Sequence, residues 1–180
     1  MSIAEVLEMA ERSMREKEYA SALSLFQDAW ALSGENLETN ERVWLLLAVA
    51  TAAVRLGDHE EAYEAIYGLH SGFADTGIVV GNPYFHLVAG LAFHGLGDDK
   101  SEDDNFARAL ICGGQAIFNG EDPRFLERTK QLLKPPAELG TWEGYEGCSS
   151  DLLNGATGYV REVIREKWSL RSDRDYQSKR

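Results

Sequence analysis

The side chains that could do chemistry in this chain do not form a catalytic or metal-binding pattern. The four histidines are His59, His70, His86 and His94. His86 and His94 fall on one predicted helix but are eight residues apart, too far for two ligands of one metal ion. Cys112 and Cys148 have no ligand spacing either, and we expect ordinary thiols rather than a disulfide framework. The sequence therefore predicts no metal site.

Enzymatic motifs are also missing from the sequence. No HExxH helix and no Gly-x-Ser-x-Gly turn occurs, and Gly113–Gly114 and the glycines of 140–144 do not follow a predicted strand, as a phosphate-binding loop requires. Carboxylates are abundant, but their number alone does not indicate a catalytic pair. We interpret them as part of solvated helix faces or as charges that attract a basic partner. We expect no enzyme and no cofactor.

Charge favours a basic protein partner. The 180 residues carry 30 Asp and Glu against 18 Lys and Arg, a formal net charge of −12. Residues 161–180 are mildly basic, with seven Lys and Arg against four Asp and Glu, so the acidity belongs to the first 160 residues. Such a surface repels nucleic acid and anionic membranes, although acidity also serves solubility alone. The partner that we expect is a protein, not nucleic acid and not a membrane.

We expect neither a secretory signal nor a membrane-spanning segment in this sequence. Its first residues are acidic and amphipathic, unlike a secretory signal, and no stretch reaches the roughly 18 uninterrupted apolar residues of a membrane span. We expect a cytoplasmic protein of one domain, long enough to bury a core without metals or disulfides.

Three parts of the chain repeat at an interval of 40 residues. Apolar and small residues recur in register, and a Leu-Gly-Asp turn occurs at 56–58 and again at 96–98. The matching sets are Leu7, Leu47 and Leu87; Ala10, Ala50 and Gly90; Ala22, Ala62 and Glu102; Phe26, Ile66 and Phe106; and Ala29, Leu69 and Ala109. A fixed period of this length is typical of stacked helical hairpins, which usually bind other macromolecules.

The helices that must position these residues can be placed from periodicity and capping. Apolar stripes at helical spacing predict helices at 3–16, 19–34, 41–56, 58–69, 83–96 and 98–110. Asp122–Pro123 and Pro135–Pro136 bound a short helix at about 123–133, and a last helix is expected at about 156–168. These C-terminal residues, 121–170, should cap the array, and 171–180 read as a disordered tail.

The repeat resembles the tetratricopeptide repeat (TPR), with units at 3–36, 43–76 and 83–116 within residues 1–120. The resemblance implies an all-α fold, three TPR-like helical hairpins in a short right-handed solenoid with a C-terminal helical cap. Two positions depart from the pattern. Lys17 replaces the turn glycine of the first unit, and Glu102 replaces the packing alanine of the third. A carboxylate is costly at a buried crossing, so we expect the second helix of that unit to begin a residue or two later.

In this family the first helix of each hairpin lines a concave groove. Carried over by position, the resemblance implies a partner-binding groove of Leu7, Glu11, Arg15, Trp44, Leu47, Thr51, Arg55, Tyr84, Leu87, Leu91 and His94. Its aromatic and aliphatic members suit binding hot spots, whereas the alternative is that some of them pack against the C-terminal cap. Electrostatic steering of a basic partner is assigned to the acidic stretch Asp98, Asp99, Glu102, Asp103 and Asp104.

A second resemblance concerns function. The run GNPYFHLVAGLAFHGLGD, residues 113–136 and the WEGYEG stretch look like small bacterial repeat proteins found beside polymorphic secreted toxins. This resemblance implies an immunity protein that neutralises a toxin by occlusion. TPR chaperones of type III secretion, which hold a secreted client, are the alternative, and a self-assembling structural module is the third. Whether the chain forms a homo-oligomer is left open by the sequence.

Overall fold

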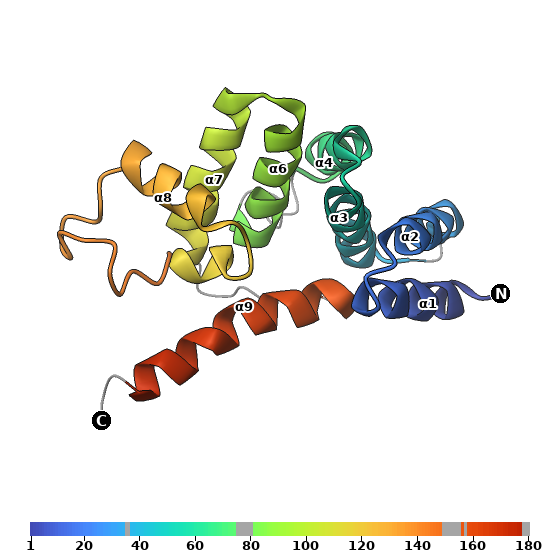
Figure 1. Cartoon of the computed structure of the whole chain (residues 1–180). Coiled ribbons are helices and arrows are strands. Elements are labelled where there is room, and N and C mark those ends of the chain that lie inside the picture. Colours follow the sequence, from blue (N-terminus) through green and yellow to red (C-terminus); the bar gives the residue numbers. More distant parts are fainter. Residues whose placement is uncertain (35–36, 75–80, 149–155, 157, 178–180) are drawn as a thin grey trace.

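Three helical hairpins follow one another along the chain, each packed against the next (Figure 1). The computed structural model describes residues 1–34, 37–74, 81–148, 156 and 158–177, with only the backbone given after 168. The hairpins pair α1 (Ile3–Arg15) with α2 (Tyr19–Ser33), α3 (Thr39–Leu56) with α4 (His59–Phe73), and α6 (Pro83–Leu96) with α7 (Asp99–Gly113). The predicted all-α fold of consecutive hairpins is confirmed.

Local signals set the tight turns inside the hairpins. Gly57 and Gly97 end α3 and α6 in the left-handed conformation, with φ of 86° and 72°. Asp58 and Asp98 then cap the next helix, each accepting a hydrogen bond from a backbone N–H three residues on. In the first hairpin Lys17 takes the same left-handed conformation, φ 62°, without being glycine. The departure from the repeat pattern at Lys17 therefore changes the residue but keeps the turn.

The core lies between the hairpins and is densest around the middle one. Buried residues run without a break from Val43 to Ala53 in α3, because this helix has neighbours on both sides. Small residues stand where two helices cross, and Ala10 and Ala50 are fully buried. At Gly90 a Cβ would lie 2.5 Å from the ring of Phe106, so only glycine fits that crossing.

The expectation that α7 starts late to keep Glu102 out of the core is wrong. α7 begins at Asp99, in register with the other hairpins, and Glu102 is 1% exposed. Its carboxylate is compensated from two directions, by Arg128 at 3.3 Å and by Nδ1 of His94 at 3.2 Å. A buried acid is tolerated at this position because Arg128, in the C-terminal part of the chain, supplies a cation.

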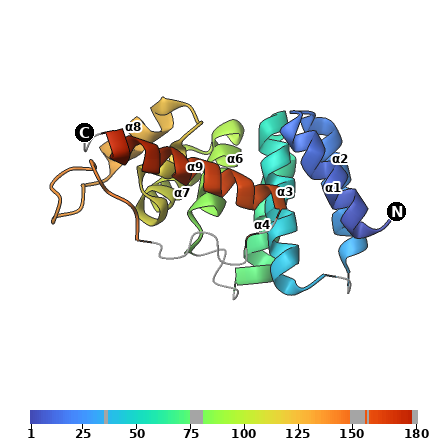
Figure 2. The same cartoon turned by 90° about the horizontal axis from the view of Figure 1, so that it is seen from below.

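The C-terminal part packs along the array. η2 (Gln115–Phe118) and α8 (Pro123–Leu132) lie against α7. The bounds of α8 are close to those predicted for the short helix at about 123–133. α9 (Gly158–Gln177) then crosses beneath the hairpins from α1 to η2 (Figure 2). Its helical backbone extends through 171–177, where the sequence predicts a disordered tail, and the last three residues lie outside the described part. No helix within the described residues is long and apolar enough to cross a membrane.

Candidate protein-binding groove

α9 lies across the face that α1, α3 and η2 present, so it covers the α1 and α3 part of the groove predicted to bind a partner (Figures 1 and 2). Val160 and Ile164, one turn apart in α9, are each 1% exposed, as is Ala156 just before the helix. These side chains bury an apolar stripe of α9 against the array. Among the predicted groove residues, Glu11 and Arg15 contact α9.

The N-terminus of α9 is held by α1. The Glu11 carboxylate accepts a hydrogen bond from the backbone N–H of Tyr159, supplying from another helix the cap that a helix N-terminus needs. Gly158 makes this approach feasible, because a Cβ at that position would overlap the Glu11 carboxylate. Arg15 binds Glu162 one turn further on, at 2.6 and 3.0 Å. Burial raises the pKa of Glu11, although the Tyr159 N–H and Arg15 oppose that shift.

A buried ionic cluster holds the middle of α9. Glu121, which follows η2, pairs with Arg55 of α3 at 2.6 Å and with Nζ of Lys167 at 2.9 Å, and its side chain is 3% exposed. Lys167 also donates to the carbonyl of Asn119, whose amide donates back to the carbonyl of Lys167. The cluster thus joins three elements that are distant in sequence.

The pKa values in this cluster show how burial and pairing compete. Burial alone would raise the pKa of Glu121, but hydrogen bonds and charges from Arg55 and Lys167 outweigh it and hold the pKa below its ordinary value. The same burial lowers the pKa of Lys167, because an ammonium ion also loses hydration there. Two cations face this one carboxylate at 2.6 and 2.9 Å, and they favour its ionised form. The carboxylate is therefore ionised at neutral pH.

The predicted groove residues fall into three groups in the structure. Those buried in the core are Trp44, Leu47, Thr51, Tyr84, Leu87 and Leu91. Those that bind α9 or the turn beside it are Glu11, Arg15 and Arg55. Leu7 and Glu11 also line an open cleft, and His94 lies half-exposed at the edge of the array beside Glu102 and Phe125. Their predicted role in partner binding stays a prediction.

Tyr84 shows how completely part of the groove is closed. Its hydroxyl lies 3.4 Å from Oγ1 of Thr51, which also donates to the carbonyl of Leu47. Burial raises the pKa of Tyr84 well above its ordinary value. A partner could reach this side chain only if the packing around it opened.

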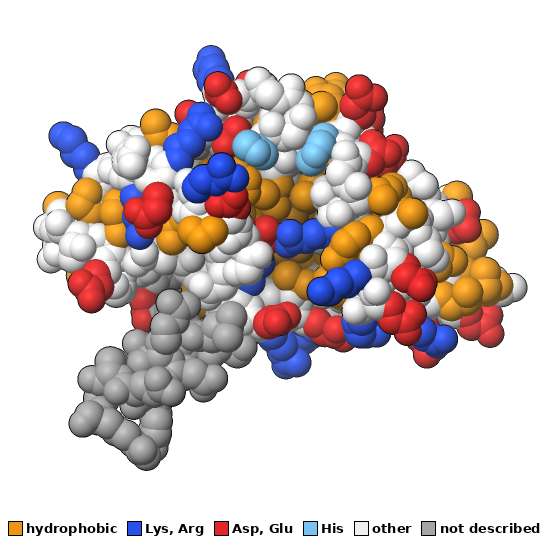
Figure 3. Space-filling model, viewed as in Figure 1, with side chains coloured by type: hydrophobic (Ala, Val, Ile, Leu, Met, Phe, Trp, Pro, Cys, Tyr) orange, Lys and Arg blue, Asp and Glu red, His pale blue; other side chains and the backbone are white. Residues whose placement is uncertain are grey.

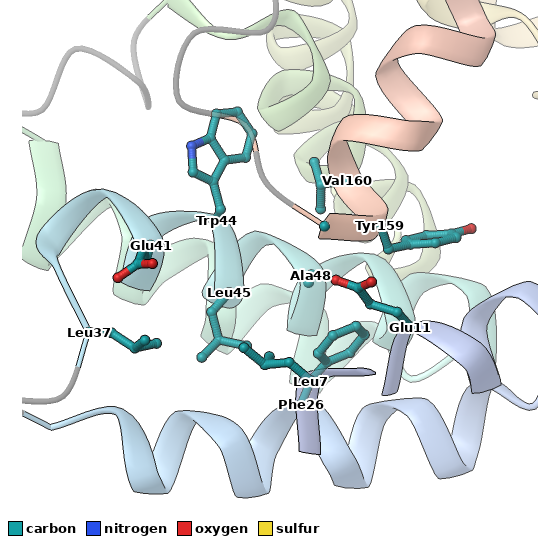
Figure 4. Close-up of a pocket in the computed structure, with 11 residues that line it drawn as sticks. Leu7, Glu11, Phe26, Leu37, Glu41, Trp44, Leu45, Ala48, Tyr159 and Val160 are labelled. Carbon is teal, nitrogen blue, oxygen red and sulfur yellow. The ribbon is translucent and has the colours of Figure 1, made fainter. Parts of the chain in front are cut away.

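The groove remains open at its N-terminal end, beyond the point where α9 begins. We call this opening the N-terminal cleft. It has a volume of about 170 Å³ between α1, α3 and the first turn of α9. Its lining residues include Leu7, Glu11, Phe26, Leu37, Glu41, Leu45, Ala48, Tyr159 and Val160. Figure 4 shows the carboxylates of Glu11 and Glu41 at opposite ends, with aliphatic side chains between them. An apolar group that carries a positive charge suits such a cleft.

A second cleft of about 170 Å³ lies beside α9, where Arg55, Glu121, Tyr159 and Lys167 meet. Figure 3 shows this face hollowed at its centre, with apolar side chains inside and charged ones around them. The charges of Arg55, Glu121 and Lys167 already compensate one another. This cleft therefore offers a ligand less net charge than the N-terminal cleft does.

The acidic stretch predicted to steer a partner is largely occupied within the molecule. Arg128 lies within ion-pair distance of Asp99, Glu102 and Asp103, and Asp104 pairs with Arg108 at 2.9 Å. Asp98 caps α7, and the hydrogen bonds from the Ser101 side chain and N–H hold its pKa below the ordinary value. These side chains are brought together by the fold, but cations accompany them. Within the described part of the chain, no three metal-ligating side chains gather at one point.

Several residues of this region were missed by sequence reasoning. Glu121, Lys167 and Glu162 lie in segments that look solvated, and only the packing of α9 reveals their partners. Arg128 did have a signal, because an acid at the packing position of Glu102 requires a nearby cation. Comparison of the chain with protein-family models, with curated proteins and with solved structures finds no match.

Proposed function

We propose that this chain is a protein-binding scaffold that acts as an immunity protein: in the cytoplasm it binds a secreted toxin and neutralises the toxin by occlusion. The observation that carries the proposal is the position of α9. An extended client segment, such as a secretion chaperone holds, would need the face that α9 covers. A folded partner needs only the surface that remains, and this favours the immunity role over the chaperone role.

The N-terminal cleft is the surface that we propose for docking. It combines an apolar floor with the Glu41 carboxylate and with that of Glu11, which Arg15 already accompanies, and the chain as a whole carries a net charge of −12. A basic partner that inserts an aliphatic or aromatic side chain beside a Lys or Arg would match both features. No metal and no cofactor take part in this proposal.

Affinity purification followed by a neutralisation assay tests the proposal. The tagged chain is purified from its native cytoplasm, and the captured protein is then expressed alone and together with the chain. The cleft variant is Leu7→Ala with Glu41→Gln, which leaves the capping role of residue 41 intact. Its control is Met9→Ala with Glu8→Gln, which also shortens one apolar side chain and removes one carboxylate, at exposed positions of α1 away from the cleft.

We expect the captured protein to be toxic alone and harmless with the wild-type chain or the control variant. The cleft variant should bind at least tenfold more weakly and should fail to protect. A captured protein that is not toxic, and whose secretion stops when the chain is deleted, would instead show a chaperone. Recovery of the chain alone, with a mass that rises with concentration, would identify a self-assembling module.

A further inference from the structure

The structure brings the two cysteines together, although 35 residues separate them in the sequence. The backbone N–H of Cys148 donates to the carbonyl of Ile111 at 3.0 Å, and Cys112 is the next residue. Standard bond lengths then place the two Cα atoms within about 7 Å of each other. Disulfides join Cα atoms roughly 4.4–6.8 Å apart, so the backbone spacing suits a bond. Both side chains are in the thiol form in this structure.

Neighbouring contacts fix the loop of Cys148 against the end of α7. Gly147, at φ 87°, lies directly on the carbonyl of Cys112 and leaves no room for a Cβ. The Tyr145 hydroxyl donates to the carbonyl of Ile111 at 2.7 Å. Burial, together with the Cys148 and Cys112 sulfurs, raises the pKa of Tyr145, because both sulfurs lie near that hydroxyl. The two cysteines are thus held in place by the fold rather than by chance approach.

The two cysteines differ in exposure, and this difference decides which of them reacts first. Cys148 is exposed and Cys112 is partly buried at the end of α7. A soluble oxidant therefore reaches Cys148 first, and Cys112 is the neighbour positioned to complete the reaction.

We propose that Cys112 and Cys148 are a disulfide-forming pair that closes in the presence of an oxidised low-molecular-weight thiol such as glutathione disulfide. The Cys148 thiolate attacks one sulfur of glutathione disulfide, forming a mixed disulfide and releasing one glutathione thiolate. The Cys112 thiolate then attacks the Cys148 sulfur and displaces the second glutathione. Two cysteine thiols lose two electrons and two protons, and glutathione disulfide gains them as two glutathione thiols.

The bond would join the end of α7 to the loop that precedes α9 in the chain, since α9 begins ten residues after Cys148. A covalent link between residues 112 and 148 removes conformations from the unfolded chain. Oxidation should therefore stabilise the folded state against unfolding.

The full-length native chain is incubated with glutathione disulfide, its remaining thiols are blocked with a maleimide, and its mass and peptides are measured. We expect a monomer that has lost two hydrogens, with a linked peptide pair containing Cys112 and Cys148. Its melting temperature should rise by roughly 5–10 °C over the reduced chain. The Cys148→Ser variant, changed at an exposed position, should show neither effect.

Three outcomes would overturn the proposal. One is a native chain that keeps two thiols reactive toward the maleimide. Another is a stable mixed disulfide on Cys148 that Cys112 does not resolve. The third is a disulfide that joins two chains, which a non-reducing gel would reveal.

Discussion

At the scale of one residue, the buried carboxylate of Glu102 should depend on the cation of Arg128 for its stability. Arg128→Ala should lower the free energy of unfolding by about 1–2 kcal/mol, because it leaves a buried carboxylate with only His94 beside it. The expected loss of stability is small for a buried acid because Arg128 is 41% exposed and water screens its charge. Urea denaturation measures the change.

A double-mutant cycle separates this pairing from general damage. Glu102→Ala restores the residue type of the matching repeat position, Ala62, so Glu102→Ala with Arg128→Ala should be more stable than Arg128→Ala alone. Additive losses in the two single variants would show that the ion pair does not matter to stability.

The ionisation of Glu121 should make the free energy of unfolding depend on pH in the acid range. Its pKa in the folded chain lies below the ordinary value of 4.5, so its contribution is complete above that pH and is lost as the pH falls through the folded pKa. Between about pH 6 and 3, the free energy of unfolding should fall more steeply in the wild type than in Glu121→Gln. The exposed Glu127→Gln is the control and should follow the wild type. Parallel curves for wild type and Glu121→Gln would refute the assignment.

At the scale of the element, the first turn of α9 depends on Gly158. Gly158→Ala places a Cβ against the Glu11 carboxylate, so the hydrogen bond from the Tyr159 N–H to Glu11 should be lost. The substitution also strains the backbone, because residue 158 has a φ of 54°, which favours glycine. We expect undocking to become easier by about 1–2 kcal/mol and amide exchange in residues 159–168 to speed up tenfold or more. Gly140→Ala, at φ 64° with open space around it, imposes strain alone and should leave that exchange unchanged.

The elements differ in how far the sequence could predict them. Helix ends such as Gly57, Asp58 and Pro83 follow from neighbours in the chain, so their positions could be read directly. The place of α9 depends on contacts with α1, α3 and η2, more than a hundred residues away in the first two cases. A helix held by Lys167 and Glu162 resembles a solvated one until its partners are known. Hence the sequence could offer the C-terminal cap only as one alternative neighbour of the groove residues, and the contacts of α9 with α1 and α3 could not be read from it.

At the scale of the whole molecule, the net charge of −12 should speed the encounter with a basic partner. The acidic stretch was predicted to steer the partner, yet Arg128 and Arg108 accompany it. We therefore expect the field of the whole surface, rather than one cluster, to set the association rate. Two variants, each with four acids changed to amides, separate these cases.

One variant changes the stretch and leaves the buried Glu102 intact: Asp98→Asn, Asp99→Asn, Asp103→Asn and Asp104→Asn. The other changes exposed acids elsewhere: Glu60→Gln, Glu64→Gln, Glu127→Gln and Glu138→Gln. Stopped-flow association with the captured partner should slow by a similar factor in both, roughly two- to fivefold at low salt, and the difference from wild type should vanish near 0.5 M salt. If association slows only in the first variant, the acidic stretch itself steers the partner. Unchanged rates in both would mean that docking depends on the cleft and not on the field.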